Sequence, residues 1–296
     1  MLRVGHFPNV THAQALVAHQ LTRQGRGWFE SRLGAEVVIQ WFVYNAGPSA
    51  MEAIFARSLD LTYVGPNPAL NAHIKSRGEE VRVIAGAARG GAALVVRGDG
   101  TIRAPADFRG RRIATPQLGN TQDVACRVWL AAQGFRVTQA GGDVQVVPAA
   151  NPDHLALFQR GDIAAAWTVE TWVSMLEEQA GGKVFVEERD AITTVLASSA
   201  RFLRERRELA RRFVMAHVEL TAWLAQNPAE AQKLMQAELL AETRREMPAD
   251  LLSGAWQRLR FTTDISRAEL ERLVADAQRV GFLPGKADVS RLVEVP

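Results

Sequence analysis

The sequence has one cysteine in 296 residues, so Cys126 cannot form a disulfide within the chain, and a zinc site of paired cysteines is excluded. A lone cysteine on an apolar helix face is typical of a small core residue. The chain also has no run of about 18 apolar residues, which excludes a membrane-spanning helix. With 47% hydrophobic and 23% charged residues, the composition predicts a globular protein of one large or two medium domains.

Lysine is scarce, because only four of the 35 basic residues are Lys, and the net charge is only +3. The densest basic stretch, residues 201–212, mixes Arg with Glu205 and Glu208, which is typical of the solvated face of a helix. We therefore expect no nucleic-acid partner. The N-terminus lacks the basic and apolar regions of a secretion signal, so we expect either a cytoplasmic protein or the trimmed form of an exported one.

Sequence motifs of common catalytic and cofactor sites are also missing. The six histidines show neither HxxxH nor HxH spacing, and there is no GxSxG elbow, GxxxxGK[ST] phosphate loop or GxGxxG turn after a strand. From these absences we expect no metal, no cofactor and no enzymatic activity.

Short apolar runs alternate with longer amphipathic segments through the first two thirds of the chain. This alternation predicts βαβ units, and hence an α/β fold with parallel sheets covered by helices. Strands are expected at residues 2–7, 35–43, 59–64, 81–88, 92–97, 111–116, 143–148 and 162–167. From about residue 201 the pattern is helical, over 206–226, 228–242, 248–258 and 267–280.

An approximate repeat indicates two similar lobes. Residues 55–61 (FARSLDL) and 158–163 (FQRGDI) each join the end of an apolar helix to a strand through a basic residue and an Asp. The chain is expected to pass between the lobes at Gly90–Gly91 and within 188–199. Lobe I would then comprise residues 1–91 and 195–296, with lobe II, residues 92–194, inserted into it.

Ligands of open α/β sheets bind beyond the carboxyl ends of the strands, where helices begin with unpaired N–H groups. Four of the five loops expected there are small, polar and uncharged, and they contain Thr11 and His12, Asn45 and Gly47, Gly65 and Asn67, and Asn120 and Thr121. Helix capping explains each loop taken alone. Together, they predict a site for an anion, made of N–H donors, hydroxyls and helix N-termini.

The fifth loop contains Glu170 beside Trp172. A carboxylate next to an anion site is unfavourable unless it meets a cation. That cation could be an amino group of the ligand or an Arg of the other lobe. Alternatively, Glu170 could stabilise the dipole of its own helix at the N-terminus. The sequence leaves these alternatives open.

Five segments carry a resemblance to a known family. They are VGHFPNVTHAQAL at 4–16, FVYNAGPSAMEAIFARSLDLTYVGPNPALNA at 42–72, IAGAARGGAALVVR at 84–97, DFRGRRIATPQLGNTQDVACRVWL at 107–130 and AAAWTVETWVS at 164–174. In this order and spacing they resemble the periplasmic substrate-binding proteins of ABC importers for nitrate, taurine and aliphatic sulfonates. The resemblance covers about residues 4–225 and is greatest to the aliphatic sulfonate binders.

The resemblance implies a type II periplasmic binding protein fold, with two Rossmann-like lobes that have parallel-sheet cores and are joined by two hinge segments. It also implies an extracytoplasmic, monomeric protein, periplasmic or anchored at the cell surface after loss of its signal, that captures a small oxyanion and delivers it to a permease and an ATPase. Carried over by position, the ligand-binding residues are Asn9, His12, Asn45, Gly47, Ser49, Gly65, Pro66, Asn67, Gly90, Gly91, Gln117, Asn120, Thr121, Gln122, Glu170 and Trp172.

Two features depart from the family pattern. Most members have Pro between the acidic residue and the aromatic one, whereas this chain has ETW at 170–172. The expected secretion signal is absent as well. The alternatives on the same scaffold are an enzyme similar to a pyrimidine synthase, which would need a Cys-rich motif, and a sensor domain for a small ligand.

Overall fold

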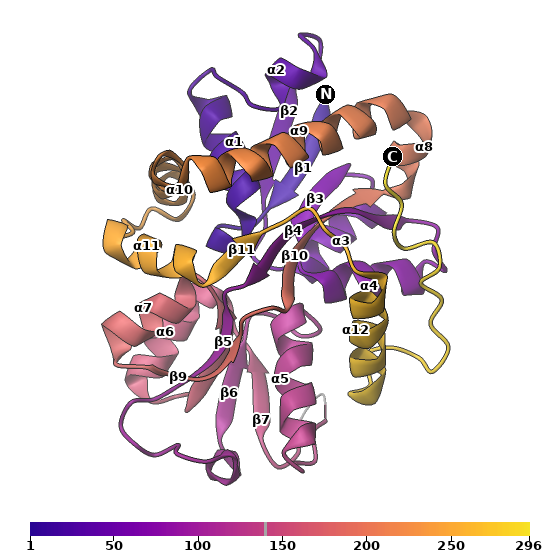
Figure 1. Ribbon diagram of the computed structural model, residues 1–296. Helices are drawn as coiled ribbons and strands as arrows, with labels where there is room; N and C mark the ends of the chain where they lie inside the picture. The colour runs from indigo at the N-terminus through magenta and orange to yellow at the C-terminus, as the bar shows by residue number, and fades with distance from the viewer. Residues whose placement is uncertain (139–140) are drawn as a thin grey trace.

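The computed structural model describes residues 1–138 and 141–296, which form two mixed β-sheets, one in each half of the molecule (Figure 1). The larger sheet, in lobe I, has the strand order β11-β4-β10-β3-β1-β2, and the smaller, in lobe II, has the order β7-β6-β8-β5-β9. The strands are β1 (Leu2–His6), β2 (Ile39–Val43), β3 (Leu61–Val64), β4 (Val81–Gly90), β5 (Ala92–Val96), β6 (Arg112–Thr115), β7 (Gln145–Pro148), β8 (Ala165–Val169), β9 (Lys183–Glu188), β10 (Ile192–Ser199) and β11 (Leu259–Phe261).

Helices surround both sheets, and α9 runs across lobe I at the end that carries both chain termini (Figure 1). Lobe II contains η2 (Pro105–Phe108), α5 (Thr121–Ala132), α6 (Asn151–Arg160) and α7 (Trp172–Ala180). The other helices belong to lobe I: η1 (Val10–His12), α1 (Ala13–Arg23), α2 (Glu30–Leu33), α3 (Gly47–Phe55), α4 (Pro66–Lys75), α8 (Ala200–Glu205), α9 (Arg207–Gln226), α10 (Pro228–Thr243), α11 (Ala249–Gln257) and α12 (Arg267–Arg279).

The predicted α/β architecture is confirmed, and all eight expected strands and four expected C-terminal helices are present within four residues of their predicted ends. The sheets are not wholly parallel, however. β1 runs parallel to β2 and β3, whereas β10 is antiparallel to β3 and β4, and β5 is antiparallel to β8 and β9. The reason is topological: β4 leaves lobe I while its neighbour β10 returns to it, so the two strands run in opposite directions.

The chain crosses between the sheets at two adjacent places. The first is Gly90–Gly91, where φ is +75° and +69°, and the second is residues 189–191. A Cβ atom on Gly90 would lie 2.4 Å from the carbonyl oxygen of Arg258, so both the backbone conformation and the space require glycine. The remainder of the expected crossing, residues 192–199, is the buried strand β10. The lobe boundaries at 91/92 and 194/195 remain predictions.

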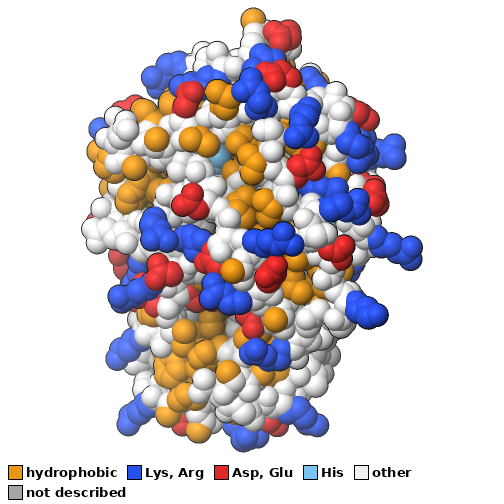
Figure 2. Space-filling view, turned by 45° about the vertical axis from the view of Figure 1, so that its right-hand side comes forward, with side chains coloured by type: hydrophobic (Ala, Val, Ile, Leu, Met, Phe, Trp, Pro, Cys, Tyr) orange, Lys and Arg blue, Asp and Glu red, His pale blue; other side chains and the backbone are white. Residues whose placement is uncertain are grey.

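The surface agrees with the sequence analysis. Figure 2 shows basic and acidic side chains interspersed over the face that it views. In the stretch 201–212, Arg211 is half exposed and pairs with Glu208 at 2.7 Å, as expected of a solvated helix face.

Cys126 is fully buried, and burial raises the pKa of its thiol. Within the described residues, no helix is both long and apolar enough to cross a membrane.

A buried histidine joins α9 to the lobe I sheet. His217 Nδ1 accepts a hydrogen bond from the Tyr63 hydroxyl at 2.9 Å, and its Nε2–H donates to the carbonyl oxygen of Gly86 at 2.8 Å. Burial lowers the pKa of His217 to about 4. The imidazole is therefore neutral in the folded protein at pH 5, where the unfolded chain would protonate it.

This difference predicts acid sensitivity. Between pH 6.5 and about 4 the unfolded state binds a proton at His217 that the folded state does not, so the free energy of unfolding falls as the pH is lowered. His217→Gln should remove about 3 kcal/mol of that loss. Urea unfolding of the wild type and the variant at pH 7 and pH 4.5 measures this change in the free energy of unfolding. Tyr63→Phe, which keeps the imidazole, should retain the wild-type pH dependence, and an unchanged dependence in His217→Gln would contradict the assignment.

Candidate functional site

Three helices begin where strands end at the junction between the lobes. In lobe I, α3 follows β2 and α4 follows β3, while α5 follows β6 in lobe II. The N-cap residues of α3 and α4 are Ala46 and Gly65, which offer no side-chain acceptor, whereas Asn120 caps α5 by accepting from the Asp123 N–H at 2.8 Å. The first turn of α3 therefore presents the N–H groups of Gly47 and Ser49, whereas in α4 Pro66 and Pro68 carry no N–H and the Asn67 N–H already donates to Thr121 Oγ1. Both helices direct the positive ends of their dipoles toward the junction.

A small cavity lies between the lobes at these helix N-termini. Its volume is about 20 Å³, which is room for about one water molecule. Its walls, all within the described part of the chain, supply amides, hydroxyls, an imidazole and backbone groups, and no Asp, Glu, Lys or Arg. The lining residues are Phe7, Asn9, Thr11, His12, Asn45, Ala46, Gly47, Gly65, Pro68, Pro116, Asn120, Thr121, Gln122, Asn151, Val169 and Thr193.

The lobes touch directly around this cavity. A Cβ atom on Gly65 would lie 2.4 Å from Thr121 Oγ1 of lobe II, and the Asn67 N–H donates to the same oxygen at 3.4 Å. On another side, Trp172 Nε1 donates to Asn9 Oδ1 at 2.9 Å. With a volume of about 20 Å³, the cavity can hold a ligand larger than water only if the lobes separate.

His12 is a neutral donor in this wall. It is buried, and its Nδ1 accepts the N–H of Phe7 at 3.3 Å, which places the ring proton on Nε2. Burial, and secondarily the proximity of His6, lowers the pKa of His12 well below its usual value. The site therefore contains an imidazole N–H without a positive charge.

Two of the residues nominated from the sequence have buried polar atoms without a protein partner. Both side-chain atoms of Asn67 and the Oε1 of Gln117 are buried and make no hydrogen bond. An unpaired buried amide costs free energy unless a ligand or water completes its bonds. Asn67 lines the groove beside the cavity, and its backbone N–H contacts Thr121.

Half of the sixteen residues that the sequence nominates line the cavity: Asn9, His12, Asn45, Gly47, Gly65, Asn120, Thr121 and Gln122. The other half do not line it: Ser49, Pro66, Asn67, Gly90, Gly91, Gln117, Glu170 and Trp172. Gly90 and Gly91 are instead required at the chain crossing, and Trp172 supports the wall from behind through Asn9.

Several lining residues escaped the sequence analysis. Asn151 begins α6 after β7 and precedes a proline, the same signature as the other loops, so a search extended to that strand would have found it. Thr193 carries no such signal, because it belongs to β10, which was not recognised as a strand.

Glu170 is paired within the protein. Its side chain is fully buried, and Oε1 accepts from Arg258 Nη1 at 2.9 Å and from the Ser174 hydroxyl at 3.0 Å. Burial raises the pKa of Glu170, and Arg258 opposes that effect. Because Arg258 follows α11 in lobe I, this ion pair joins the two lobes, and Glu170 has no free oxygen facing the cavity lining.

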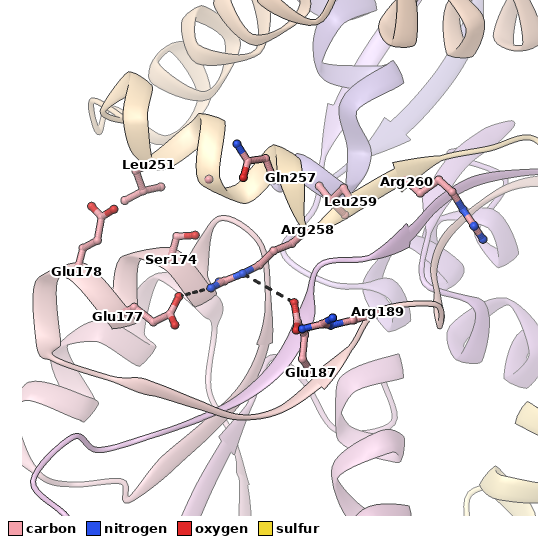
Figure 3. Close-up of a pocket in the computed structure, with 11 residues that line it drawn as sticks. Ser174, Glu177, Glu178, Glu187, Arg189, Leu251, Gln257, Arg258, Leu259 and Arg260 are labelled. Atoms are coloured by element: carbon pink, nitrogen blue, oxygen red, sulfur yellow. Dashed lines mark hydrogen bonds and ion pairs between the residues drawn. The ribbon is translucent and has the colours of Figure 1, made fainter.

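Arg258 also closes a larger hollow at the lobe junction, of about 590 Å³ (Figure 3). There Arg258 lies between Glu177 at 2.7 Å and Glu187 at 4.0 Å, and Arg189 pairs with Glu187 at 2.7 Å. The hollow is therefore lined by paired acidic and basic side chains and by a further carboxylate, that of Glu178, which makes it a weaker candidate for a small anion than the uncharged cavity.

An apolar groove of about 340 Å³ adjoins the cavity. It shares Thr121 with the cavity and is lined mainly by apolar side chains, among them Val128, Trp129, Trp167 and Val186. Its lining also includes Asn67 and the carboxylates of Glu188 and Asp276. A polar cavity and an apolar groove thus meet at Thr121.

Comparisons with known proteins agree with this architecture. The model of the NMT1-like family matches residues 1–240. The taurine-binding periplasmic protein of Escherichia coli (strain K12) is 29% identical over 167 residues, which are 55% of this chain and 48% of that protein. The match therefore spans about half the length of this relative.

Two solved structures share the fold. The alkanesulfonate-binding protein SsuA from Xanthomonas axonopodis pv. citri, bound to MOPS, has a TM-score of 0.82 at 20% identity, covering 100% of this chain and 98% of that one. The periplasmic nitrate-binding protein NrtA from Synechocystis PCC 6803 has a TM-score of 0.81 at 13% identity, covering 99% and 86%. The two-lobed periplasmic binding protein fold expected from the sequence is thereby confirmed.

The ion pair across the lobes gives a test of the junction. Arg258→Gln leaves Glu170 buried without its cation and should lower the free energy of unfolding by about 2 kcal/mol at pH 8, less than for a fully buried pair because Arg258 is partly exposed. The loss should shrink at pH 5, because protonation of Glu170, whose pKa burial already raises, then replaces the missing guanidinium.

Arg260→Gln is the matched control, since Arg260 is exposed and its only ion pair, with Asp190, measures 3.9 Å in the described structure. Urea unfolding of both variants at the two pH values is the measurement. Equal losses for the two variants, or a loss in Arg258→Gln that does not change with pH, would show that the pair does not hold the lobes together.

Proposed function

This protein belongs to the NMT1-like family, and from that premise we propose that it is the extracytoplasmic solute-binding component of an ABC importer, which captures a small organic oxyanion between its lobes. The observation that carries the proposal is the cavity itself. Helix N-termini, amides and hydroxyls converge there without a single acidic or basic side chain among its described lining residues.

Such a lining suits an oxyanion better than any other small ligand. Backbone N–H groups and helix dipoles favour negative charge and provide several donors to a multiply oxygenated head group. The Nε2–H of His12 adds a donor in the cavity wall, and the free amide of Asn67 adds one in the adjoining groove. A cation would find no carboxylate in this lining, and an apolar ligand would leave the donors unpaired.

The adjoining groove supports an organic anion over an inorganic one. We propose that the head group binds at Thr121 and that an aliphatic tail lies along the groove walled by Trp129 and Trp167. Burial of a methylene group contributes about 0.8 kcal/mol, so even a short tail adds measurable affinity.

The pairing of Glu170 bears on the choice between an alkyl sulfonate and taurine. An amino group on the ligand needs an acceptor, but Glu170 is already held by Arg258 and Ser174. The two carboxylates that line the groove have partners as well, because Glu188 accepts from Trp167 Nε1 and Asp276 pairs with Arg279. We therefore propose an aliphatic sulfonate without an amino group as the preferred ligand, and assign Glu170 to the junction between the lobes rather than to the ligand.

Capture would proceed by closure of the lobes about Gly90–Gly91 and residues 189–191, because these two short segments are the places where the described chain crosses between the sheets. In this role the protein acts as a monomer, periplasmic or anchored at the cell surface, and delivers its ligand to a permease with an ATPase. The taurine-binding relative is named as periplasmic, which supports that location.

Substitutions at the start of α5 test the site. Thr121→Val and Asn120→Ala each remove a polar group from the cavity wall, and each should weaken binding of 1-butanesulfonate by about 1.5–3 kcal/mol, roughly 10- to 100-fold in Kd. Isothermal titration calorimetry measures the change.

Thr101→Val is the control, because it makes the same chemical change in an exposed loop of lobe II. It should bind butanesulfonate like the wild type. Wild-type affinity in both cavity variants would place the ligand elsewhere and refute this site.

A further inference from the structure

Four titratable side chains converge in lobe I, away from the cavity between the lobes. His6 ends β1, His19 lies on α1, and Glu238 and Glu242 lie one turn apart on α10, which packs beside α1 (Figure 1). We call these four residues the His–Glu cluster. None of them lines the interlobe cavity, and the proposed transport function makes no use of them.

The donor atoms of the cluster are close together. His6 Nε2 lies 2.9 Å from Glu242 Oε1 and 3.2 Å from His19 Nδ1, and His19 Nδ1 lies 3.1 Å from the same Glu242 oxygen. His19 Nδ1 is also 2.7 Å from Glu238 Oε1. Three of the atoms thus form a nearly equilateral triangle, and the fourth lies beside one corner.

Hydrogen bonds alone do not account for this arrangement. A ring nitrogen carries at most one proton, yet His19 Nδ1 faces three acceptor or donor atoms and His6 Nε2 faces two. Ligands about 2.0–2.1 Å from a tetrahedral Zn²⁺ are about 3.3 Å apart, close to the sides of the triangle. The spacing is that of ligands around an ion.

Surrounding groups orient the two imidazoles toward the centre. His6 Nδ1 faces the carbonyl oxygen of Phe7 at 3.4 Å, which favours a proton on Nδ1 and a free lone pair on Nε2. The indole of Trp41 stacks on His19 with centroids 5.1 Å apart and meets the His6 ring edge-on at 5.6 Å. A second observation is that Glu242 Oε2 is buried and has no partner.

The carboxylates of the His–Glu cluster outnumber the arginine and lysine side chains that pair with them. Two buried carboxylates face the cluster, and the guanidinium of Arg23 pairs with Glu238 only, at 2.9 Å. In the described structure Glu242 contacts the two imidazoles and forms no ion pair with an Arg or Lys.

We propose that His6 Nε2, His19 Nδ1 and Glu242 Oε1 bind one Zn²⁺ ion. Glu238, which pairs with Arg23, lies beside His19 and is not one of the three ligands. Two imidazoles and one carboxylate favour zinc over Mg²⁺ or Ca²⁺, which prefer oxygen ligands. The ion would join the first strand and α1 to α10, and we assign it a structural role because none of the three ligand side chains is more than 11% exposed.

The direct test is metal binding by the wild-type protein after treatment with a chelator. Calorimetric titration with Zn²⁺ should give one ion per chain, and the midpoint of thermal unfolding should rise by roughly 5 °C at 100 times the Kd. Titration with Co²⁺ should give the intense visible bands of a tetrahedral site. Weak binding of several ions, or no binding, would overturn the proposal and leave the cluster as a network of protonated histidine and carboxylate.

Substitution then locates the ion. His6→Gln and Glu242→Gln should each abolish the stoichiometric Zn²⁺ site and the Co²⁺ bands, with folding checked by circular dichroism. His154→Gln is the control, because His154 is equally buried but bonds to the carbonyl oxygen of Ala149 in lobe II. Retention of the Co²⁺ spectrum in either cluster variant would refute this assignment, and the wild-type titration decides the matter if a variant does not fold.

Discussion

The uncharged character of the cleft depends on ion pairs formed behind it. Asp123 in the first turn of α5 is held by Arg127 at 3.1 Å and by the hydroxyl of Thr115, and Glu170 is held by Arg258. With these carboxylates neutralised, the field at the cavity is that of the helix N-termini, each equivalent to about half a positive charge. An unpaired carboxylate at either place would oppose an anion in the cavity by several kcal/mol before screening.

The topology determines why these groups meet. β4 continues into β5 and β9 into β10 through only a few residues, so the carboxyl ends of β1–β4 face the carboxyl ends of β6–β9, while β5 and β10 begin at the junction. Loops that follow β1, β2 and β3 then meet loops that follow β6, β7 and β8. Gly90 is essential here, because Arg258 and Arg189 carbonyl oxygens occupy the space that any side chain would need.

Site residues that belong to a motif of adjacent residues could be predicted from the sequence. Contacts between residues far apart in the sequence could not. Asn120 and Thr121 were found because a strand, a turn and a cap stand side by side in the chain. Arg258 was not, because it lies 88 residues from Glu170, and nothing in the sequence distinguishes it from the other arginines. For the same reason the search for local histidine spacing missed the His–Glu cluster, whose members come from β1, α1 and α10.

The central claim, that an uncharged cleft recognises a negatively charged head group, is tested most directly by calorimetric titration with ligands of one skeleton. 1-Butanesulfonate carries the charge, 1-butanesulfonamide has nearly the same shape without it, and 4-amino-1-butanesulfonate adds an ammonium group. The account predicts that the sulfonate binds tightest, that the amino compound binds more weakly, and that the sulfonamide does not bind measurably. Equal affinity for sulfonate and sulfonamide would contradict it.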